Sequence, residues 1–165
     1  MEKQNETAES SLKTYILENT PARIRERYAH LKEYVQTHTF GALDADVVVL
    51  DTETTGFSFN HDELIQIAAA RMCNGEIVEW YVTFVNPGKE IPDEVAHLTN
   101  IHEEDVADAP DPDTALAGLV DFVGDSLVVA HNVGFDRTFV TKRAAGATLK
   151  NNIWIDSLDL ARIAL

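Results

Sequence analysis

The 165-residue sequence predicts an α/β domain built on a mixed five-stranded sheet with helices on both faces. The apolar run VVVL at 47–50 is typical of a strand buried on both sides. Two β-rich runs, 63–73 and 76–86, are joined by Asn74-Gly75, which is a strong signal for an antiparallel hairpin. From residue 114 onward, helical and strand patterns alternate. Because the first strand leads into a hairpin and no G-x-G-x-x-G follows it, a dinucleotide-binding fold is disfavoured.

The region before the first strand is predicted to be a polar tail followed by one helix. Residues 1–12 are polar and are expected to be disordered. Thr20 suits a helix N-cap and Pro21 suits the first helical position. An apolar stripe then recurs at helical spacing: Ile24, Tyr28, Leu31 and Val35. Such a stripe could dock on the main domain or contact a partner, and docking is favoured. We therefore assign 1–45 to a tail and amphipathic helix, and 46–165 to the main domain.

The remaining elements follow from periodicity and from helix and strand boundaries. The segment 87–112 is expected to be loop with a short helix, because it lacks a sustained period. The later elements are a helix at 114–124, a buried strand at 126–131, a helix at 135–146 that ends at Gly146, a strand at 152–156 and a final helix at 157–165.

Composition restricts the class of protein. No apolar run is long enough to cross a bilayer and the N-terminal residues lack the pattern of a secretory signal, so we expect a cytoplasmic protein with no membrane partner. A single cysteine excludes an internal disulfide framework and a cysteine-built zinc site. The net charge of -15 argues against a nucleic-acid partner. The acids are concentrated, however: residues 44–125 hold nineteen acidic and two basic residues. A solvated acidic face explains most of them.

Asp51 and Glu53 come at the end of the first predicted strand. Side chains two residues apart on a strand point to the same face, so these carboxylates project together. Two carboxylates at the end of a buried strand repel each other unless a cation is present, and Mg²⁺ or Mn²⁺ prefers oxygen ligands. Gly56 then allows a close approach of backbone or ligand. The alternative to a metal site is that the strand ends here and both carboxylates are solvated.

A second polar group follows the strand at 126–131. His131 and Asn132 come at its end, and Asp136 lies at the start of the next helix. A structural, hydrogen-bonded histidine and an acid that complements a helix dipole are the ordinary explanations for His131 and Asp136. In an open α/β sheet, however, the ends of adjacent strands meet in a crevice where ligands bind. Three carboxylates from two strand ends would then converge.

Three segments, in order along the chain, resemble the motifs of a known enzyme family. DTETTG at 51–56, LTNI at 98–101 with a DAP-like spacing at 108–110, and HNVGFD at 131–136 are similar to motifs of the DEDD 3'-to-5' exonucleases. The resemblance is closest to the branch that contains the proofreading epsilon subunit of bacterial DNA polymerase III, ribonuclease T and oligoribonuclease. It runs from Asp46 to Leu165 and implies a ribonuclease H-like fold.

The resemblance also implies the chemistry and its residues. Asp51, Glu53 and Asp136 match catalytic carboxylates that hold two Mg²⁺ or Mn²⁺ ions, which would hydrolyse phosphodiester bonds at single-stranded DNA or RNA 3' ends, with a DNA polymerase as a partner to consider. The residues it assigns to substrate binding are Thr54, Thr55, Gly56, Phe57, Thr99, His131 and Asn132. Phe57 would offer its ring to a base. Asn100 stands where the family has a glycine.

The family's third motif, H-x-x-x-x-D, supplies a general-base histidine and a fourth carboxylate. The helix predicted after Asp156 reaches Leu165 before any such motif appears on it, so we expect a C-terminally truncated exonuclease with one metal ligand missing and weak or no activity. The C-terminal third carries four basic residues that either meet phosphates or form an ordinary solvated helix face: Arg137, Lys142, Arg143 and Lys150. The alternative function is a non-catalytic nucleic-acid-binding or polymerase-associated module on the same fold. A third hypothesis is an enzyme that performs a different reaction on a similar sheet.

Overall fold

The computed structural model describes residues 46–164 together with residues 22, 26 and 29. The predictions for residues 1–12 and for the apolar stripe of the N-terminal helix lie outside these residues. The chain divides into two compact units, one of residues 42–156 and the other of residues 1–41 and 157–165. Of the second unit, the structure describes helix α7 (Ser157–Ala164), in which Asp159 and Arg162 form an ion pair at 3.7 Å. None of the helices that the structure describes is long and apolar enough to cross a membrane.

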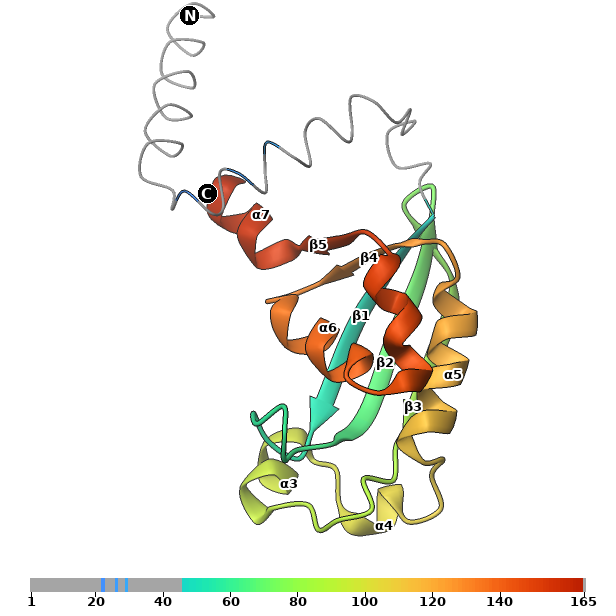
Figure 1. Cartoon of the computed structure of the whole chain (residues 1–165), viewed down its shortest axis with the longest axis vertical. Helices are drawn as coiled ribbons and strands as arrows, with labels where there is room; N and C mark the ends of the chain where they lie inside the picture. The colour runs from blue at the N-terminus through green and yellow to red at the C-terminus, as the bar shows by residue number, and fades with distance from the viewer. Residues whose placement is uncertain (1–21, 23–25, 27–28, 30–45, 165) are drawn as a thin grey trace, which may run out of the picture. The chain divides into compact units, whose positions relative to one another are not determined.

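The unit of residues 42–156 is built on a five-stranded sheet of order β3-β2-β1-β4-β5 (Figure 1). Its strands are β1 (Val47–Thr54), β2 (Leu64–Cys73), β3 (Glu76–Phe84), β4 (Leu127–Ala130) and β5 (Trp154–Asp156). The pairs β1 with β2 and β2 with β3 are antiparallel, whereas β1 with β4 and β4 with β5 are parallel. The predicted mixed five-stranded sheet is therefore confirmed.

The hairpin between β2 and β3 forms where the sequence places it. Asn74 and Gly75 both have positive φ, at 53° and 79°. Two consecutive left-handed residues are what a type I′ turn requires, and its twist matches that of the strands it joins. A bulge between Arg71 and Met72 then interrupts the ladder near the tip of the hairpin.

The helices are short. They are α3 (Asp93–Thr99), α4 (Glu103–Val106), α5 (Pro112–Val123), α6 (Gly134–Thr141) and the 3-10 helix η1 (Ala144–Asn151). The predicted single helix at 135–146 is wrong, because α6 ends at Thr141 and Arg143 has an extended backbone with ψ 153°. A Cβ at Gly146 would overlap the carbonyl oxygen of Val140. Gly146 therefore serves the close packing of η1 on α6 and does not terminate α6.

The two faces of the sheet have different surroundings. On one face, α5, α6 and η1 pack over the strands (Figure 1). Side chains from these helices and from the strands form the main core: Val48, Leu50, Leu64, Ile67, Ala69, Val85, Ala115, Leu116, Leu119, Val123, Val128, Phe139, Val140 and Leu149. The register puts alternate residues such as Val49, Trp80 and Val82 on the other face, where they are exposed. We predicted helices on both faces of the sheet. Among the described residues of this unit, helices cover one face.

Candidate active site

Two of the predicted carboxylates lie on the open face of β1. Asp51 is exposed and Glu53 is half-buried, while the intervening Thr52 points to the covered face and is 7% exposed. Burial raises the pKa of Glu53, and the negative charge of Asp51 raises it further. The strand therefore holds two repelling carboxylates on one surface, as its alternation predicts.

The third carboxylate, Asp136, lies in the first turn of α6 and is almost completely buried, with 3% of its surface exposed. The hydroxyl of Thr52 donates a hydrogen bond of 2.8 Å to Asp136 Oδ1. Burial raises the pKa of Asp136 to about 6, although the Thr52 bond opposes the shift and the charge of Asp51 adds to it. The sequence segments around 51–53 and 136 are therefore brought together.

Asp136 reaches β1 because β4 is short. The ladder between β1 and β4 joins only Val47–Val49, so β1 continues past the last residue of β4. The chain then turns through Asn132, which has a positive φ of 60° and whose backbone N–H donates to Asp156 Oδ1 at 3.0 Å. Helix α6 begins two residues later, beside the free length of β1. His131 and Asn132 are exposed at this turn.

The chemistry of this donor set suits a divalent cation. Burial and mutual repulsion raise the pKa values of Glu53 and Asp136, and a bound cation would offset both effects. Oxygen-only ligands are those that Mg²⁺ and Mn²⁺ prefer. Among the described residues, no three His, Cys, Asp or Glu side chains form a group that could hold a metal ion as they stand. The predicted two-metal site therefore stays a prediction.

The segment after β1 folds on itself around Asp62. The Thr55 hydroxyl donates to Asp62 Oδ1 at 3.0 Å, and the Ser58 N–H donates to Oδ2 at 2.9 Å. Thr54 donates to the Gly56 carbonyl at 2.6 Å. A Cβ at Gly56 would lie 2.5 Å from Asp62 Oδ2, so this position leaves room for the aspartate. The hydroxyls of the two buried threonines thus bond within the loop.

Aromatic rings line this loop. Phe57 is 82% exposed and its ring centroid lies 6.0 Å from that of Phe135, the residue before Asp136. Phe59 contacts Phe135 at 6.1 Å and the buried Phe139 at 5.3 Å. An exposed ring on a supported aromatic cluster beside the carboxylates is a surface on which a base can stack.

The segment LTNI ends α3. Asn100 has a φ of 56° and caps the helix with its N–H donating to the Ala96 carbonyl. Asparagine tolerates this left-handed conformation better than most residues, so it can replace a glycine here. Thr99 is half-buried, and its hydroxyl donates to the Val95 carbonyl at 2.9 Å.

Two of the four basic residues predicted to meet phosphates are held by acids. Lys142 and Arg143 both contact Glu63 Oε2, at 3.3 and 3.1 Å, and Arg143 also lies 3.5 Å from Asp113. Lys142 additionally donates to the Asp62 carbonyl. These cations therefore tie α6 and η1 to the loop after β1, which weakens their assignment to phosphate binding.

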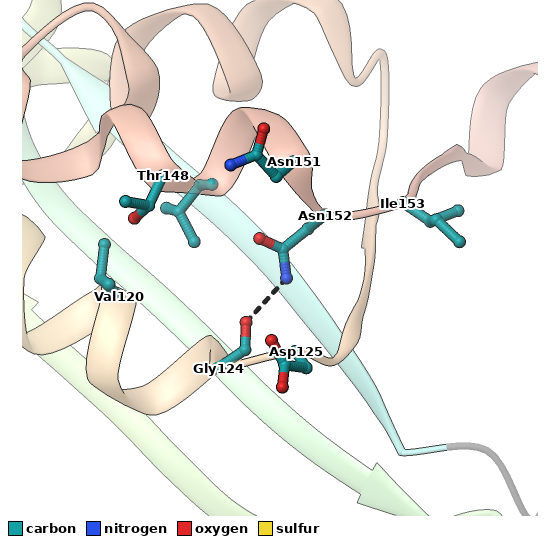
Figure 2. A pocket seen from close by; sticks show the side chains of 8 residues that line it. Val120, Gly124, Asp125, Thr148, Asn151, Asn152 and Ile153 are labelled. Atoms are coloured by element: carbon teal, nitrogen blue, oxygen red, sulfur yellow. Dashed lines mark hydrogen bonds between the residues drawn. The ribbon is translucent and has the colours of Figure 1, made fainter.

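A pocket of about 460 Å³ lies away from the carboxylates, before the start of β4 (Figure 2). Its wall comes from the end of α5, the end of η1 and the segment that follows each: Val120, Gly124, Asp125, Thr148, Leu149, Asn151, Asn152 and Ile153. Asn152 Nδ2 donates to the carbonyls of Gly124 and Ser126, at 2.8 and 2.9 Å. The asparagine thus joins the two segments.

Three residues at the site were not predicted. Thr52 and Phe135 are each next to a predicted carboxylate in the sequence. The alternation of side chains along a strand is the signal that could have identified Thr52, because it puts this residue on the face opposite to Asp51 and Glu53. Asp62 lies in a loop whose sequence carries no distinguishing signal. Its role comes from the folded turn.

Comparison with protein families finds a match over residues 48–165 to a family described as "Exonuclease". Among curated proteins, the chain is 42% identical over 123 residues to a "DNA polymerase III PolC-type" of Clostridium perfringens. It is 37% identical over 121 residues to a protein of the same name from Staphylococcus aureus. The matches cover 73% and 72% of this chain and 8% of each relative, so the chain spans less than a tenth of their length.

Among solved structures, the chain resembles Exonuclease X in complex with 5' overhanging duplex DNA. The TM-score is 0.53 at 26% identity, over 70% of this chain and 62% of the other. Exonuclease I in its apo form gives a TM-score of 0.61 at 19% identity, over 72% and 30%. At that identity the second likeness shows the fold alone, and it agrees with the predicted ribonuclease H-like architecture.

Proposed function

The chain belongs to the exonuclease family, and we propose from this that its domain at 46–165 is a metal-dependent exonuclease that hydrolyses phosphodiester bonds from 3' ends. The observation that carries the proposal is the hydrogen bond from Thr52, between Asp51 and Glu53 on β1, to Asp136 at the start of α6, where the charge of Asp51 acts on the buried carboxyl of Asp136. A buried carboxyl with a raised pKa that feels the charge of a second carboxylate is a common feature of a reactive site.

The carboxylates would hold Mg²⁺ or Mn²⁺, and such ions supply an activated water and stabilise the leaving oxygen in phosphodiester hydrolysis. Asp51 and Glu53 offer their oxygens from the open face of β1. The hydroxyl of Thr52 holds one oxygen of Asp136 in place. The loop bonds of Thr54 and Thr55 keep the end of β1 in place, so we assign these two hydroxyls to positioning.

We propose single-stranded 3' ends as the substrate, and DNA in preference to RNA. The relatives are named as DNA polymerases and Exonuclease X was solved with DNA, which supports this choice. Phe57 would stack on a terminal base, with Phe135 behind it. Gly56, Thr99, His131 and Asn132 would border the same nucleotide. The PolC-type relatives also make a polymerase a candidate partner.

Calorimetric titration with Mn²⁺ tests the metal site without requiring turnover. We expect Asp51→Asn to weaken binding by at least about tenfold, because it removes a charged oxygen ligand. Asp113→Asn is the matched control, since Asp113 is an exposed acid on α5 whose side chain is 60% exposed. Equal losses in the two variants would mean that Mn²⁺ only screens an acidic surface.

Hydrolysis of oligonucleotides tests the reaction. A 5'-labelled single-stranded DNA should shorten stepwise, release mononucleotides and resist attack when its 3' end is phosphorylated. Asp51→Asn should lower the rate by on the order of 10²-fold or more, since metal ions contribute several kcal/mol of charge stabilisation. Activity that survives this substitution would place the chemistry elsewhere.

A non-catalytic nucleic-acid-binding module is the second candidate. It is favoured by the lack, among the described residues, of three side chains already arranged to hold a metal. Such a module would bind single-stranded DNA with unchanged affinity when Asp51 is replaced and would need no divalent cation. Titration of labelled DNA with and without Mn²⁺ separates the two functions.

A further inference from the structure

We propose that β3 is a self-association surface through which two copies of this chain pair edge to edge, extending the sheet across a two-fold axis. In the part of the chain that the structure describes, β3 has β2 as its sheet neighbour and no strand on its other side. This inference is independent of the proposed catalytic function.

The outer edge of β3 presents outward-facing backbone groups in one stretch, and one of them, the Phe84 carbonyl, also accepts a hydrogen bond of 2.8 Å from the Thr83 hydroxyl. The Val85 N–H donates to the Ile65 carbonyl at 2.9 Å, so Val85 faces β2. In an antiparallel ladder the direction of the backbone groups alternates, so those of Phe84, Val82 and Trp80 point away from β2. Beyond this stretch, the Asn86 N–H is bonded to the Pro110 carbonyl, and the Arg71 to Met72 bulge distorts the other end. The open edge is therefore residues 80–84.

This edge lacks the features that protect natural sheet edges. Residues 80–84 read W-Y-V-T-F and contain no charge and no proline. The three side chains on the open face are exposed: Trp80 at 63%, Val82 at 58% and Phe84 at 37%. The nearest acid, Glu79, is paired with Arg71 at 3.6 Å. A regular apolar edge of this kind is a template for another strand.

The sequence of the edge fits a second copy of itself. Antiparallel pairing centred on Val82 puts Val82 opposite Val82 and Trp80 opposite Phe84, which places apolar and aromatic side chains together on one face. No like charges oppose each other in this register. Pairing centred on Trp80 would instead set Phe84 against Glu76 and run into the bulge. The register centred on Val82 is therefore the one that we propose.

Sedimentation velocity of the 165-residue chain tests the proposal. One strand pair is a small interface, so we expect a dissociation constant in the roughly micromolar range. The net charge of -15 makes the copies repel, so raising the salt concentration should tighten the dimer several-fold. A chain that stays monomeric at about 100 µM in high salt overturns the proposal.

Single substitutions then test the register. Val82→Lys puts two like charges directly opposite each other and should raise the dissociation constant at least about tenfold. Val78→Lys is the matched control: Val78 is on the same strand and 57% exposed, but lies in the bulge outside the proposed pairing. Equal effects of the two substitutions contradict the register. Circular dichroism melting should show both variants folded.

A charge-reversal pair gives the sharpest result. Val82→Glu should also dissociate the homodimer, whereas an equimolar mixture of V82K and V82E should restore a dimer, because position 82 faces itself across the axis. If a dimer persists in V82K alone, or the mixture stays monomeric, the proposed pairing is wrong.

Discussion

The two faces of β1 belong to one strand and yet meet different demands. Val48 is fully buried under the helices, whereas its neighbour Val49 is 38% exposed on the open face. Thr52 turns toward α6 on the covered face, and Asp51 and Glu53 occupy the open one. The covered face therefore provides stability through packing, while the open face is available for chemistry. Substitutions on each face test this difference.

The largest effect is expected where the covered face is packed most closely. Gly146→Ala should lower the free energy of unfolding by at least about 3 kcal/mol, because its Cβ would overlap the Val140 carbonyl and η1 would have to move off α6. Urea unfolding measures the change. Gly134→Ala is the control, since nothing lies within 4 Å of a Cβ there, and it should change stability by less than about 1 kcal/mol. Similar losses in both variants would show that η1 is not closely seated.

The next effect compares the two faces with one residue type. Val48→Ala should cost about 2 to 3 kcal/mol, from two lost methyl groups and the cavity they leave. Val49→Ala should cost under about 1 kcal/mol, since Val49 is already partly in water. Chemical denaturation of both variants checks the difference. If Val49→Ala is as costly as Val48→Ala, the second face is covered in solution.

The sequence predicted the division only in part. The run VVVL was expected to be buried on both sides, and the register of β1 does place its residues alternately, but Val49 is exposed. Periodicity reports where a strand lies and cannot report which neighbouring element covers it. The hairpin was predictable because Asn74-Gly75 carries its own backbone preference. The end of α6 was not, because Gly146 signals a helix end in sequence and serves a tertiary contact in the fold.

The site shows the same limit. Asp51, Glu53 and Asp136 could be selected from strand ends and a family resemblance. Their surroundings could not, because the Thr52 to Asp136 bond joins residues 84 positions apart and exists only in the folded chain. The pairing of Lys142 and Arg143 with Glu63 is equally non-local, which is why a basic segment was interpreted as a phosphate-binding surface.

At the boundary between the faces, Asp136 is expected to oppose folding when no metal is present. Its pKa is raised to about 6, above the value of about 3.9 for an unfolded chain. Because the folded state holds this proton more tightly than the unfolded state, the carboxyl contributes its full stability below the unfolded pKa. This contribution is lost as the pH rises through about 6. In EDTA, Asp136→Asn should therefore stabilise the protein by on the order of 2 kcal/mol at pH 7.5 and by very little at pH 4.

Thermal or urea unfolding across this pH range measures the effect of Asp136→Asn. Asparagine can still accept the Thr52 hydrogen bond, so the substitution changes the charge and little else. Adding Mg²⁺ should stabilise the parent chain and not the variant, so that the parent becomes the more stable of the two. A variant that is less stable than the parent at every pH in EDTA would show that the ionised Asp136 is better solvated than its burial indicates.

The smallest effect on stability is expected at Phe57. Its side chain is 82% exposed and touches the fold through the tilted ring contact with Phe135, so Phe57→Ala should change the free energy of unfolding by less than about 1 kcal/mol. If a base stacks on this ring, the same substitution should raise KM for single-stranded DNA by about tenfold, since stacking contributes roughly 1 to 3 kcal/mol per base. Ile77→Ala, at an exposed apolar position near the hairpin tip, is the control and should leave KM unchanged. A loss of kcat with unchanged KM would contradict stacking and would instead connect Phe57, through Phe135, to the position of Asp136.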